Sequence, residues 1–300
     1  MSDNTVSANR AITWRDYLEL TKPKVVALML LTVIIGMLVA EPGLPSLATV
    51  FWGNLGIALL SGAAAVINHV VDHEIDARMA RTRRRPVATG RLSNADALGF
   101  SATLGLAGML VLVWQVNMIT AWLTLASLVG YAVIYTVFLK RATPQNIVIG
   151  GLAGAMPPLL GWTAVTGTVD PNGLLLVLII FAWTPPHFWA LAIHRKEEYA
   201  QVDIPMLPVT HGNRFTELHI LLYTFMLFAV SLLPVATGMS GMIYLVGATL
   251  LGLRFLQYAF RLWWGDDRRV ALDTFKYSIT YLMLLFVVLL VDHFVRFPEI

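Results

Sequence analysis

The sequence predicts an all-α polytopic membrane protein with about nine transmembrane helices. The first observation is composition: 57% of the 300 residues are hydrophobic and only 13% are charged, against roughly 25% charged residues in an ordinary soluble domain. The second is the length of the apolar runs, several of which approach or exceed the roughly 18 to 20 residues that cross a bilayer core. Such spans are helical because a backbone in lipid must satisfy its own hydrogen bonds. The sequence has no cysteine, which excludes disulfides and thiolate metal sites.

The positive charges support nine spans, because Lys and Arg collect in short cytoplasmic loops. Basic residues lie before the first span and after the second, fourth, sixth and eighth, whereas the connections on the opposite side contain none. This pattern predicts a cytoplasmic N-terminus and an external C-terminus. Hydropathy places the spans, in order, at 24–40, 48–70, 95–115, 119–139, 146–164, 173–194, 216–237, 241–262 and 273–294.

The domain organisation follows from these spans. We expect a cytoplasmic segment 1–23, a single nine-helix membrane domain 24–294 and an external tail 295–300. The first residues are polar and charged, and they do not resemble a cleaved signal peptide. Two cytoplasmic connections, 68–93 and 194–214, are longer and more polar than the others. Function is therefore expected in these two loops.

The first loop begins with polar side chains at every fourth position: Asn68, Asp72 and Asp76. On a helix these residues lie one turn apart along one face. Mg²⁺ prefers oxygen ligands and is commonly bound by one or two carboxylates together with substrate phosphates. A solvated acidic helix end is the alternative interpretation, but the row directly continues an apolar span. The spacing therefore predicts a magnesium site at the membrane edge.

A basic run follows the acidic row at residues 77–86. Guanidinium groups bind phosphate oxygens through forked hydrogen bonds. Carboxylates that bind the metal, followed by arginines that bind the phosphates, therefore suit a diphosphate complexed with a metal ion. Topology and anionic lipid also explain a basic cluster at a cytoplasmic membrane edge, and for most of these arginines both explanations stay open. The proximity to the acidic row predicts that a diphosphate site contains at least one of Arg78, Arg81, Arg84 and Arg85.

The second loop repeats the four-residue spacing with Tyr199 and Asp203. A mixed-charge loop is usually only solvated, but two such loops on one side of the membrane make opposed sites plausible. Asp203 is the better metal ligand, and Tyr199 is expected to donate a hydrogen bond. The remaining candidates for substrate contact in this loop are Lys196, His194 and His211.

The sixth span carries a paired proline next to a histidine, in Trp-Thr-Pro-Pro-His-Phe-Trp at 183–189. Prolines break helical hydrogen bonds, which a membrane tolerates only where protein or a cavity covers the freed groups. His187 is a functional candidate because ionisable groups at such depth are costly, although a neutral histidine bonded to a neighbouring helix is the alternative. Trp183 and Trp189 could line an isoprenoid channel and stabilise a cation through their ring faces, or simply pack.

These motifs together resemble the UbiA superfamily of intramembrane prenyltransferases. The acidic row followed by residues 79–86 resembles its first aspartate-rich motif. Residues 183–189 and 203–208 (Asp-Ile-Pro-Met-Leu-Pro) resemble the branch that uses haem B as the acceptor. The usual second motif has two aspartates four residues apart, and Tyr199 replaces the first of them here. This departure leaves the ligands of any second Mg²⁺ open.

The resemblance implies a UbiA-like helical bundle in the bacterial inner membrane and transfer of a farnesyl group from farnesyl diphosphate to the 2-vinyl group of haem B. Water adds, giving haem O and diphosphate. Mg²⁺ held by Asn68, Asp72, Asp76 and Asp203 would be the cofactor, with haem B as a substrate. His187, His194 or His211 would position haem or handle the water. The partners implied are membrane lipid and haem A synthase or a terminal-oxidase assembly, with no nucleic acid.

Three other functions remain as alternatives. The same fold and diphosphate site could serve an aromatic or quinone-precursor acceptor. A secondary transporter would also have broken helices and intramembrane polar residues, but its ionisable groups would lie near the bilayer midplane, whereas here they gather at the cytoplasmic edge. A haem-handling assembly protein would have no use for paired acidic and basic loops.

Overall fold

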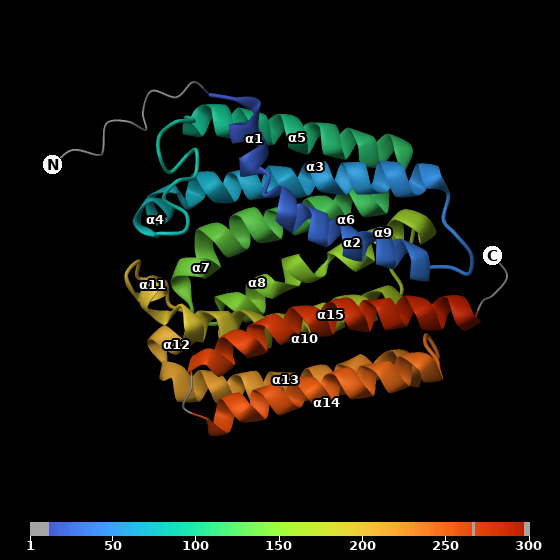
Figure 1. Cartoon of the computed structure of the whole chain (residues 1–300). Coiled ribbons are helices and arrows are strands. Elements are labelled where there is room, and N and C mark those ends of the chain that lie inside the picture. The colour runs from blue at the N-terminus through green and yellow to red at the C-terminus, as the bar shows by residue number, and fades with distance from the viewer. Residues whose placement is uncertain (1–11, 266–267, 297–300) are drawn as a thin grey trace.

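The computed structural model describes residues 12–265 and 268–296, and this part of the chain folds into helices without any strand. The predicted all-α class is confirmed (Figure 1). In chain order the elements are α1 (Trp14–Leu20), α2 (Pro23–Val39), α3 (Leu47–Val71), α4 (His73–Arg78), α5 (Asn94–Gln115), α6 (Met118–Val129), the π-helix η1 (Gly130–Leu139), α7 (Lys140–Ala142), α8 (Asn146–Ala155), α9 (Pro157–Thr166), α10 (Pro171–His194), α11 (Lys196–Ala200), α12 (Leu207–Thr210), α13 (Gly212–Ala236), α14 (Met242–Trp264) and α15 (Arg268–Arg296).

The predicted number of spans agrees with the structure. Among the described residues, eight helices are long and apolar enough to cross a membrane, or nine if α1 and α2, bent by 52° at their break, count as one. The last span begins at Arg268 rather than at 273. Its first turns are polar and precede the apolar run, so hydropathy does not detect them. The predicted segment 1–23 and tail 295–300 lie only partly within the described residues.

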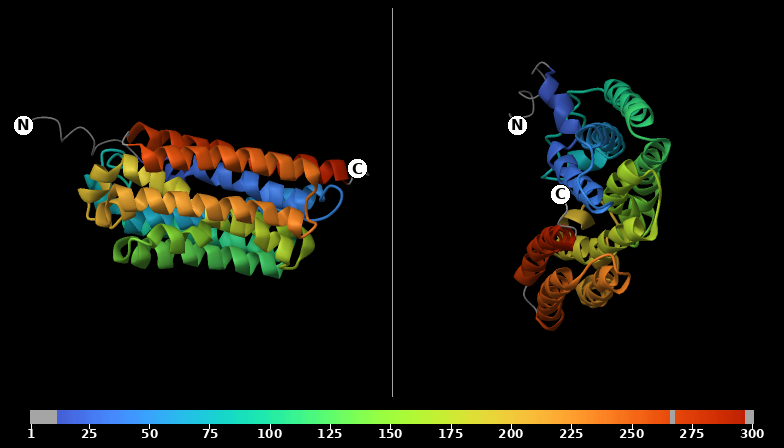
Figure 2. Two further views of the ribbon diagram at one scale, coloured as in Figure 1. Left: turned by 90° about the horizontal axis from the view of Figure 1, so that it is seen from below. Right: turned by 90° about the vertical axis from the view of Figure 1, so that its right-hand side faces the viewer.

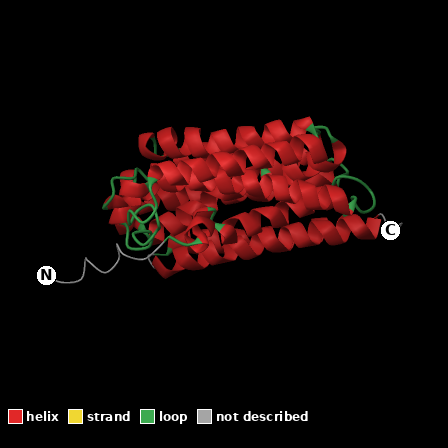
Figure 3. Cartoon of the chain, turned by 90° about the horizontal axis from the view of Figure 1, so that it is seen from above, coloured by secondary structure: helices red, strands yellow, loops and turns green. Residues whose placement is uncertain are grey.

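The two predicted functional loops lie at the same end of the bundle. The short helices α4, α11 and α12 gather where α1 begins, whereas α15 ends at the opposite end (Figure 1). Loop segments concentrate at the two ends of the helices, as Figure 3 shows. Seen along the bundle, the helices of the first half and the group α13, α14 and α15 occupy different sides (Figure 2). The fold therefore brings both polar loops together at one membrane edge.

Glycines allow α2 and α9 to cross with their backbones in contact. A Cβ at Gly36 would lie 2.0 Å from the carbonyl oxygen of Pro158, and one at Gly161 would lie 2.0 Å from that of Val33. Membrane helices gain little from apolar burial alone, because lipid tails are equally apolar, so close backbone packing is a main source of stability. These two positions therefore require glycine.

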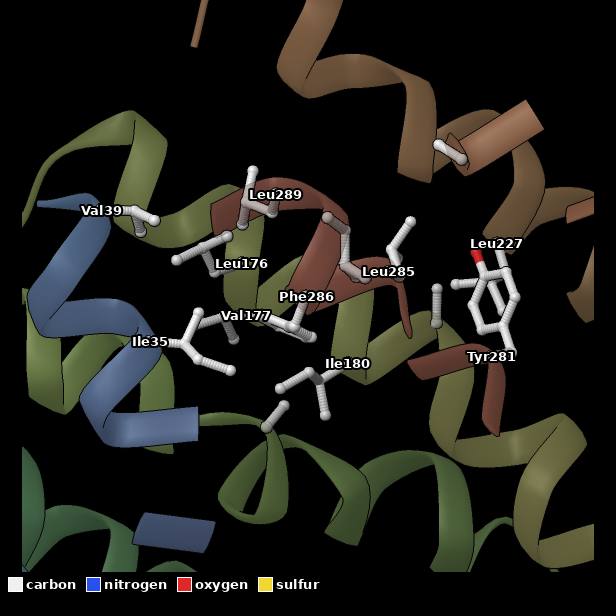
Figure 4. Close-up of a cluster of buried hydrophobic side chains, with 14 of the residues drawn as sticks. Ile35, Val39, Leu176, Val177, Ile180, Leu227, Tyr281, Leu285, Phe286 and Leu289 are labelled. Carbon is white, nitrogen blue, oxygen red and sulfur yellow. The ribbon is translucent and has the colours of Figure 1, made fainter. Parts of the chain in front are cut away.

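Apolar side chains from α2, α10, α15 and several neighbouring helices interlock in one buried cluster. Because lipid provides no hydrophobic driving force between helices, dense van der Waals packing holds this cluster together. It links the first helix of the membrane domain to the last one and closes the bundle. Figure 4 shows its members, among them Ile35 and Val39 of α2, Leu176 of α10, and Leu285 and Leu289 of α15.

Candidate active site

The acidic row lies where α3 passes into α4. Asn68, Asp72 and Asp76 are all buried, with at most 5% of each residue exposed. The backbone N–H of Asp72 donates to the carbonyl of Asn68 at 3.0 Å, and that of Asp76 donates to the carbonyl of Asp72 at 2.8 Å. Helical hydrogen bonds thus continue across the junction. The four-residue spacing therefore places the three side chains on one side of the chain.

Each member of the row meets a cation, and two of these three cations come from distant parts of the chain. Lys22 Nζ donates to Asn68 Oδ1 at 2.5 Å, and Lys140 Nζ donates to Asp72 Oδ2 at 2.6 Å. Arg85 Nη1 forms an ion pair with Asp76 Oδ2 at 2.6 Å. Such charge-assisted bonds between buried groups are strong. The site is therefore an alternating cluster of oxygen ligands and cations.

Lys22 and Lys140 were not among the residues predicted for the site. The sequence places both next to the ends of spans, where topology already explains a basic residue. No local pattern separates these two lysines from the other basic residues of the same membrane edge. Of the four arginines predicted for the site, Arg85 alone is half-buried and pairs with the row. The side chains of the other three are exposed: Arg78, Arg81 and Arg84.

A divalent cation fits the row on the chemistry of its donors. Asp72 Oδ1 is buried and has no hydrogen-bond partner, so one carboxylate oxygen is left for a further cation. The described residues hold no group of three or more His, Cys, Asp or Glu side chains that could bind a metal by itself. Two carboxylates and an amide oxygen, completed by substrate phosphates, are the incomplete oxygen set that Mg²⁺ uses. The row therefore suits a metal that arrives with a diphosphate.

A π-helix supplies the wall opposite the row. Asn68 Nδ2 donates to Thr136 Oγ1 at 3.2 Å, and Thr136 donates in turn to the carbonyl of Tyr131 at 2.8 Å. The Tyr131 hydroxyl accepts from Lys22 at 3.4 Å. π-helical turns are rare and occur often at functional sites. Hydropathy detects only a span here, so no pattern in the sequence indicates the contact that Thr136 makes with the row.

The two loops are joined by apolar contacts. Met79 of the first loop belongs to one buried cluster with Val202 and Ile204 of the second, and Ile75 packs against it. Next to this contact lies a cavity of about 210 Å³ lined by Glu74, Ile75, Arg78, Arg141, Val202, Asp203 and Ile204. Asp203 is exposed and has a φ of 55°, a left-handed conformation that Asp and Asn adopt more readily than most residues. Asp203 therefore shares a cavity with Arg78, and the acidic row does not line it.

The remaining second-loop candidates differ in their surroundings. Burial raises the pKa of the Tyr199 phenol, and nearby Arg81 and Arg195 oppose this shift. The hydroxyl therefore stays protonated near neutral pH and can donate a hydrogen bond. Lys196 is half-buried, whereas the side chains of His194 and His211 are exposed.

The aromatic residues of α10 separate into two environments. His187 is buried, and its Nδ1 lies 2.6 Å from Ser278 Oγ of α15. Trp183 stacks on the His187 ring at 4.1 Å. Trp189 is fully buried and packs edge-on against Tyr223 of α13 at 5.3 Å. Trp189 therefore lies in the core between α10 and α13 and does not share the surroundings of Trp183 and His187.

A family model described as the UbiA prenyltransferase family matches residues 29–289, which is most of the chain. The chain belongs to the UbiA prenyltransferase family. The resemblance stated from the motifs is thereby confirmed.

Among curated relatives of this UbiA-family chain is the protoheme IX farnesyltransferase of Marinobacter nauticus. It is 78% identical over 96% of this chain and 95% of its own length. A solved structure of digeranylgeranylglyceryl phosphate synthase has a TM-score of 0.80 at 19% identity, over 93% of this chain and 98% of its own. A solved structure of a UbiA homologue from Archaeoglobus fulgidus bound to GPP and Mg²⁺ has a TM-score of 0.62 at 14% identity. The match covers 91% of this chain and 99% of that one. At such identities the two structures support the fold alone.

Proposed function

We propose that this UbiA-family enzyme transfers a farnesyl group from farnesyl diphosphate to a vinyl group of haem B, giving haem O and diphosphate. The observation that carries the proposal is the buried acidic row, each member of which meets one cation. This arrangement fits a metal diphosphate and occurs in a chain 78% identical to a protoheme IX farnesyltransferase. The haem acceptor rests on that likeness and on the motifs of α10.

The chain's own residues bind and orient the leaving group. Mg²⁺ held by Asn68, Asp72 and Asp76 would neutralise the negative charge that develops on the diphosphate. Without substrate, the carboxylate and amide oxygens of the row accept hydrogen bonds from Lys22, Lys140 and Arg85. When the diphosphate binds, these cations would turn from the row to the phosphate oxygens, which are negatively charged acceptors. Preorganised cations of this kind are a main source of transition-state stabilisation.

The reaction then proceeds through carbocations. Cleavage of the C1–O bond of farnesyl diphosphate leaves an allylic cation, and the vinyl group attacks its C1 carbon. The new carbon–carbon bond places the positive charge on the porphyrin side, where water adds and loses a proton. The buried row and the apolar contact between the loops limit access of bulk water before this step. Tyr199, whose hydroxyl is protonated, would donate a hydrogen bond to the diphosphate.

Asp203 is proposed to complete the diphosphate site from the second loop. It lies beside Arg78 in the shared cavity, so a second metal or the outer phosphate could bind between the loops. Asp203→Asn is the appropriate variant, because Asn tolerates the same left-handed backbone. If Asp203 takes part, this variant loses activity and regains part of it at high Mg²⁺ concentration. Unchanged kinetics would exclude Asp203 from the site.

The membrane placement follows from the charges. We propose that the chain resides in the bacterial inner membrane with its N-terminus and both polar loops in the cytoplasm, where farnesyl diphosphate is soluble. Haem B and membrane lipid are the other partners, and haem A synthase or a terminal-oxidase assembly would receive the product. Cysteine introduced at Ser93, in the first loop, should react with an impermeant thiol reagent only after the inner face is exposed.

The deciding experiment is product analysis with purified protein. Protein in detergent is incubated with haem B, farnesyl diphosphate and Mg²⁺, and haem O is sought by mass spectrometry. Asp72→Asn should abolish the product, whereas Asp273→Asn, an exposed carboxylate on α15, should not. If the enzyme turns over a quinone precursor but not haem B, the proposed acceptor is wrong and the quinone precursor takes its place. Absence of diphosphate release with any acceptor would refute the enzymatic proposal.

A further inference from the structure

Two exposed arginines lie on α14, which is one of the helices long and apolar enough to cross a membrane. The side chains of Arg254 and Arg261 are both exposed, and none of the ion pairs formed by the described residues includes either of them. A charged side chain in a membrane helix is costly, and such groups are usually paired or mark a functional site. These two arginines therefore point to an anionic partner outside the chain.

The two guanidinium groups converge on one aromatic ring. Cζ of Arg254 lies 5.0 Å from the centroid of the Tyr258 ring, and Cζ of Arg261 lies 5.9 Å from it. Arg254 Nη1 also donates to Gln257 Oε1, so this side chain extends toward the end of the helix where Arg261 lies. Tyr258 is fixed in turn, because Tyr277 of α15 stacks on it with centroids 4.8 Å apart. The fold therefore holds both cations around a single, well-positioned ring.

This pair of arginines lies near the membrane edge at the polar end of the bundle. Leu262, the neighbour of Arg261, belongs to the buried cluster that also contains Ile204 and Leu207 of the second loop. Arg254 lies seven residues deeper, about 10 Å by helical rise. Its long side chain turns back toward the edge, as charged side chains near the ends of membrane helices do. Both guanidinium groups thus approach the level of the lipid phosphates.

The same face of α14 is apolar toward the middle of the membrane. Leu253, Leu250 and Val246 are each more than half exposed, and their spacing places them on one side of the helix. Contacts between membrane helices typically use small residues, but the glycines of α14 face Phe228 of α13 and Val288 of α15 instead. An acyl chain therefore fits this surface better than a further helix does.

The neighbouring helix adds no net charge to this face. Asp273 and Lys276 of α15 are both exposed and lie three residues apart, so their charges offset each other. The positive charge of the face therefore comes from Arg254 and Arg261. Guanidinium groups bind phosphate oxygens through forked hydrogen bonds, and basic sites beside membrane helices bind anionic head groups.

We propose that Arg254 and Arg261 form a specific site for an anionic phospholipid in the leaflet at the polar end of the bundle. The phosphate lies between the two guanidinium groups beside Tyr258, and an acyl chain follows Leu250 and Val246. This site differs from the general contact that every membrane helix makes with lipid, because it selects by the charge of the head group. It is separate from the acidic row and does not depend on the proposed haem acceptor. A lipid that binds the folded protein in this way also stabilises it.

The test is binding of phosphatidylglycerol to the purified protein in detergent, measured by native mass spectrometry, with zwitterionic phosphatidylcholine as the comparison lipid. Arg254→Gln and Arg261→Gln should each weaken phosphatidylglycerol binding about fivefold, which corresponds to about 1 kcal/mol per basic residue at an anionic surface. The double variant should bind the two lipids equally. The wild type should unfold at a higher temperature in phosphatidylglycerol than in phosphatidylcholine. The double variant should lose this difference but keep the wild-type Tm in phosphatidylcholine, which shows that it is folded.

Arg15→Gln is the matched control. Arg15 is also exposed and lies at the same end of the bundle with its Cζ 5.6 Å from the Trp14 ring, but no second arginine of the described residues lies over that ring. This variant should keep the wild-type lipid preference.

Equal binding of the two lipids by the wild type would overturn the inference, and so would a preference that survives in the double variant. Inorganic phosphate that raised the Tm as much as phosphatidylglycerol would assign the arginines to a free anion. Loss of a co-purifying membrane protein from the double variant, with the lipid preference intact, would assign them to a protein interface. Either of these two results would also overturn the lipid site.

Discussion

Replacing Lys140 with methionine removes the ammonium group that neutralises Asp72. The two groups form an ion pair at 2.6 Å, and their side chains are only 14% and 2% exposed. Removing one partner of a buried pair costs about 3 to 5 kcal/mol, because the other charge is left without compensation. The partial exposure of Lys140 favours the lower value, about 3 kcal/mol. For a chain of this size that is a fall in Tm of roughly 6 °C.

Magnesium should reverse most of this loss in Lys140→Met. The metal would supply a cation to the same carboxylate, and at about 100 times its Kd such binding stabilises by about 2.7 kcal/mol. The wild type should gain less, because the Lys140 ammonium group already neutralises this carboxylate and repels a second cation at its free oxygen. The measurement is thermal unfolding of purified protein in detergent, with EDTA and with increasing Mg²⁺.

Two variants control for this effect of Lys140. Lys140→Arg keeps the charge and should behave nearly as wild type. Lys24→Met removes an exposed lysine at the start of α2 and should change Tm little in either condition. The reasoning would be refuted if Lys140→Met unfolded at the wild-type temperature in EDTA. Equal magnesium shifts in both proteins would refute competition between metal and ammonium.

Three further predictions address the row, the packing and the second loop. Arg85→Ala should lower the rate of diphosphate release about 100-fold, as loss of a charge-stabilising donor does, and Arg83→Ala, whose side chain is exposed, should not. Gly36→Ala should destabilise the fold by about 1 to 3 kcal/mol because its Cβ meets a backbone oxygen, whereas Gly99→Ala, with nothing within 4 Å, should be neutral or stabilising in thermal unfolding. Tyr199→Phe should slow release. Because burial raises the pKa of this phenol above its ordinary value, the hydroxyl stays protonated throughout the neutral range, so the rate profiles of variant and wild type should have the same shape there.

Local patterns determined much of the site. The run of apolar residues and the alternation of basic loops require only the chemistry of the bilayer, so the spans could be placed to within a few residues. The acidic row at 68–76 was also readable, because residues four apart along a continuous run of helical hydrogen bonds need no other part of the chain to become neighbours. The second loop was found for the same reason. Its junction with the first depends on apolar contacts such as Met79 with Val202, which no spacing reveals.

The sequence by itself determined the fold class, the polar end of the bundle and the residues of the acidic row, since each follows from composition or from spacing along a short stretch of chain. Only the tertiary structure decided which cations serve that row and what holds the intramembrane histidine. Lys22 reaches Asn68 across 46 positions, Lys140 reaches Asp72 across 68, and His187 meets Ser278 across 91. The sequence contains other lysines and serines near the ends of spans and within them, and helix packing alone brings these particular ones within hydrogen-bonding distance.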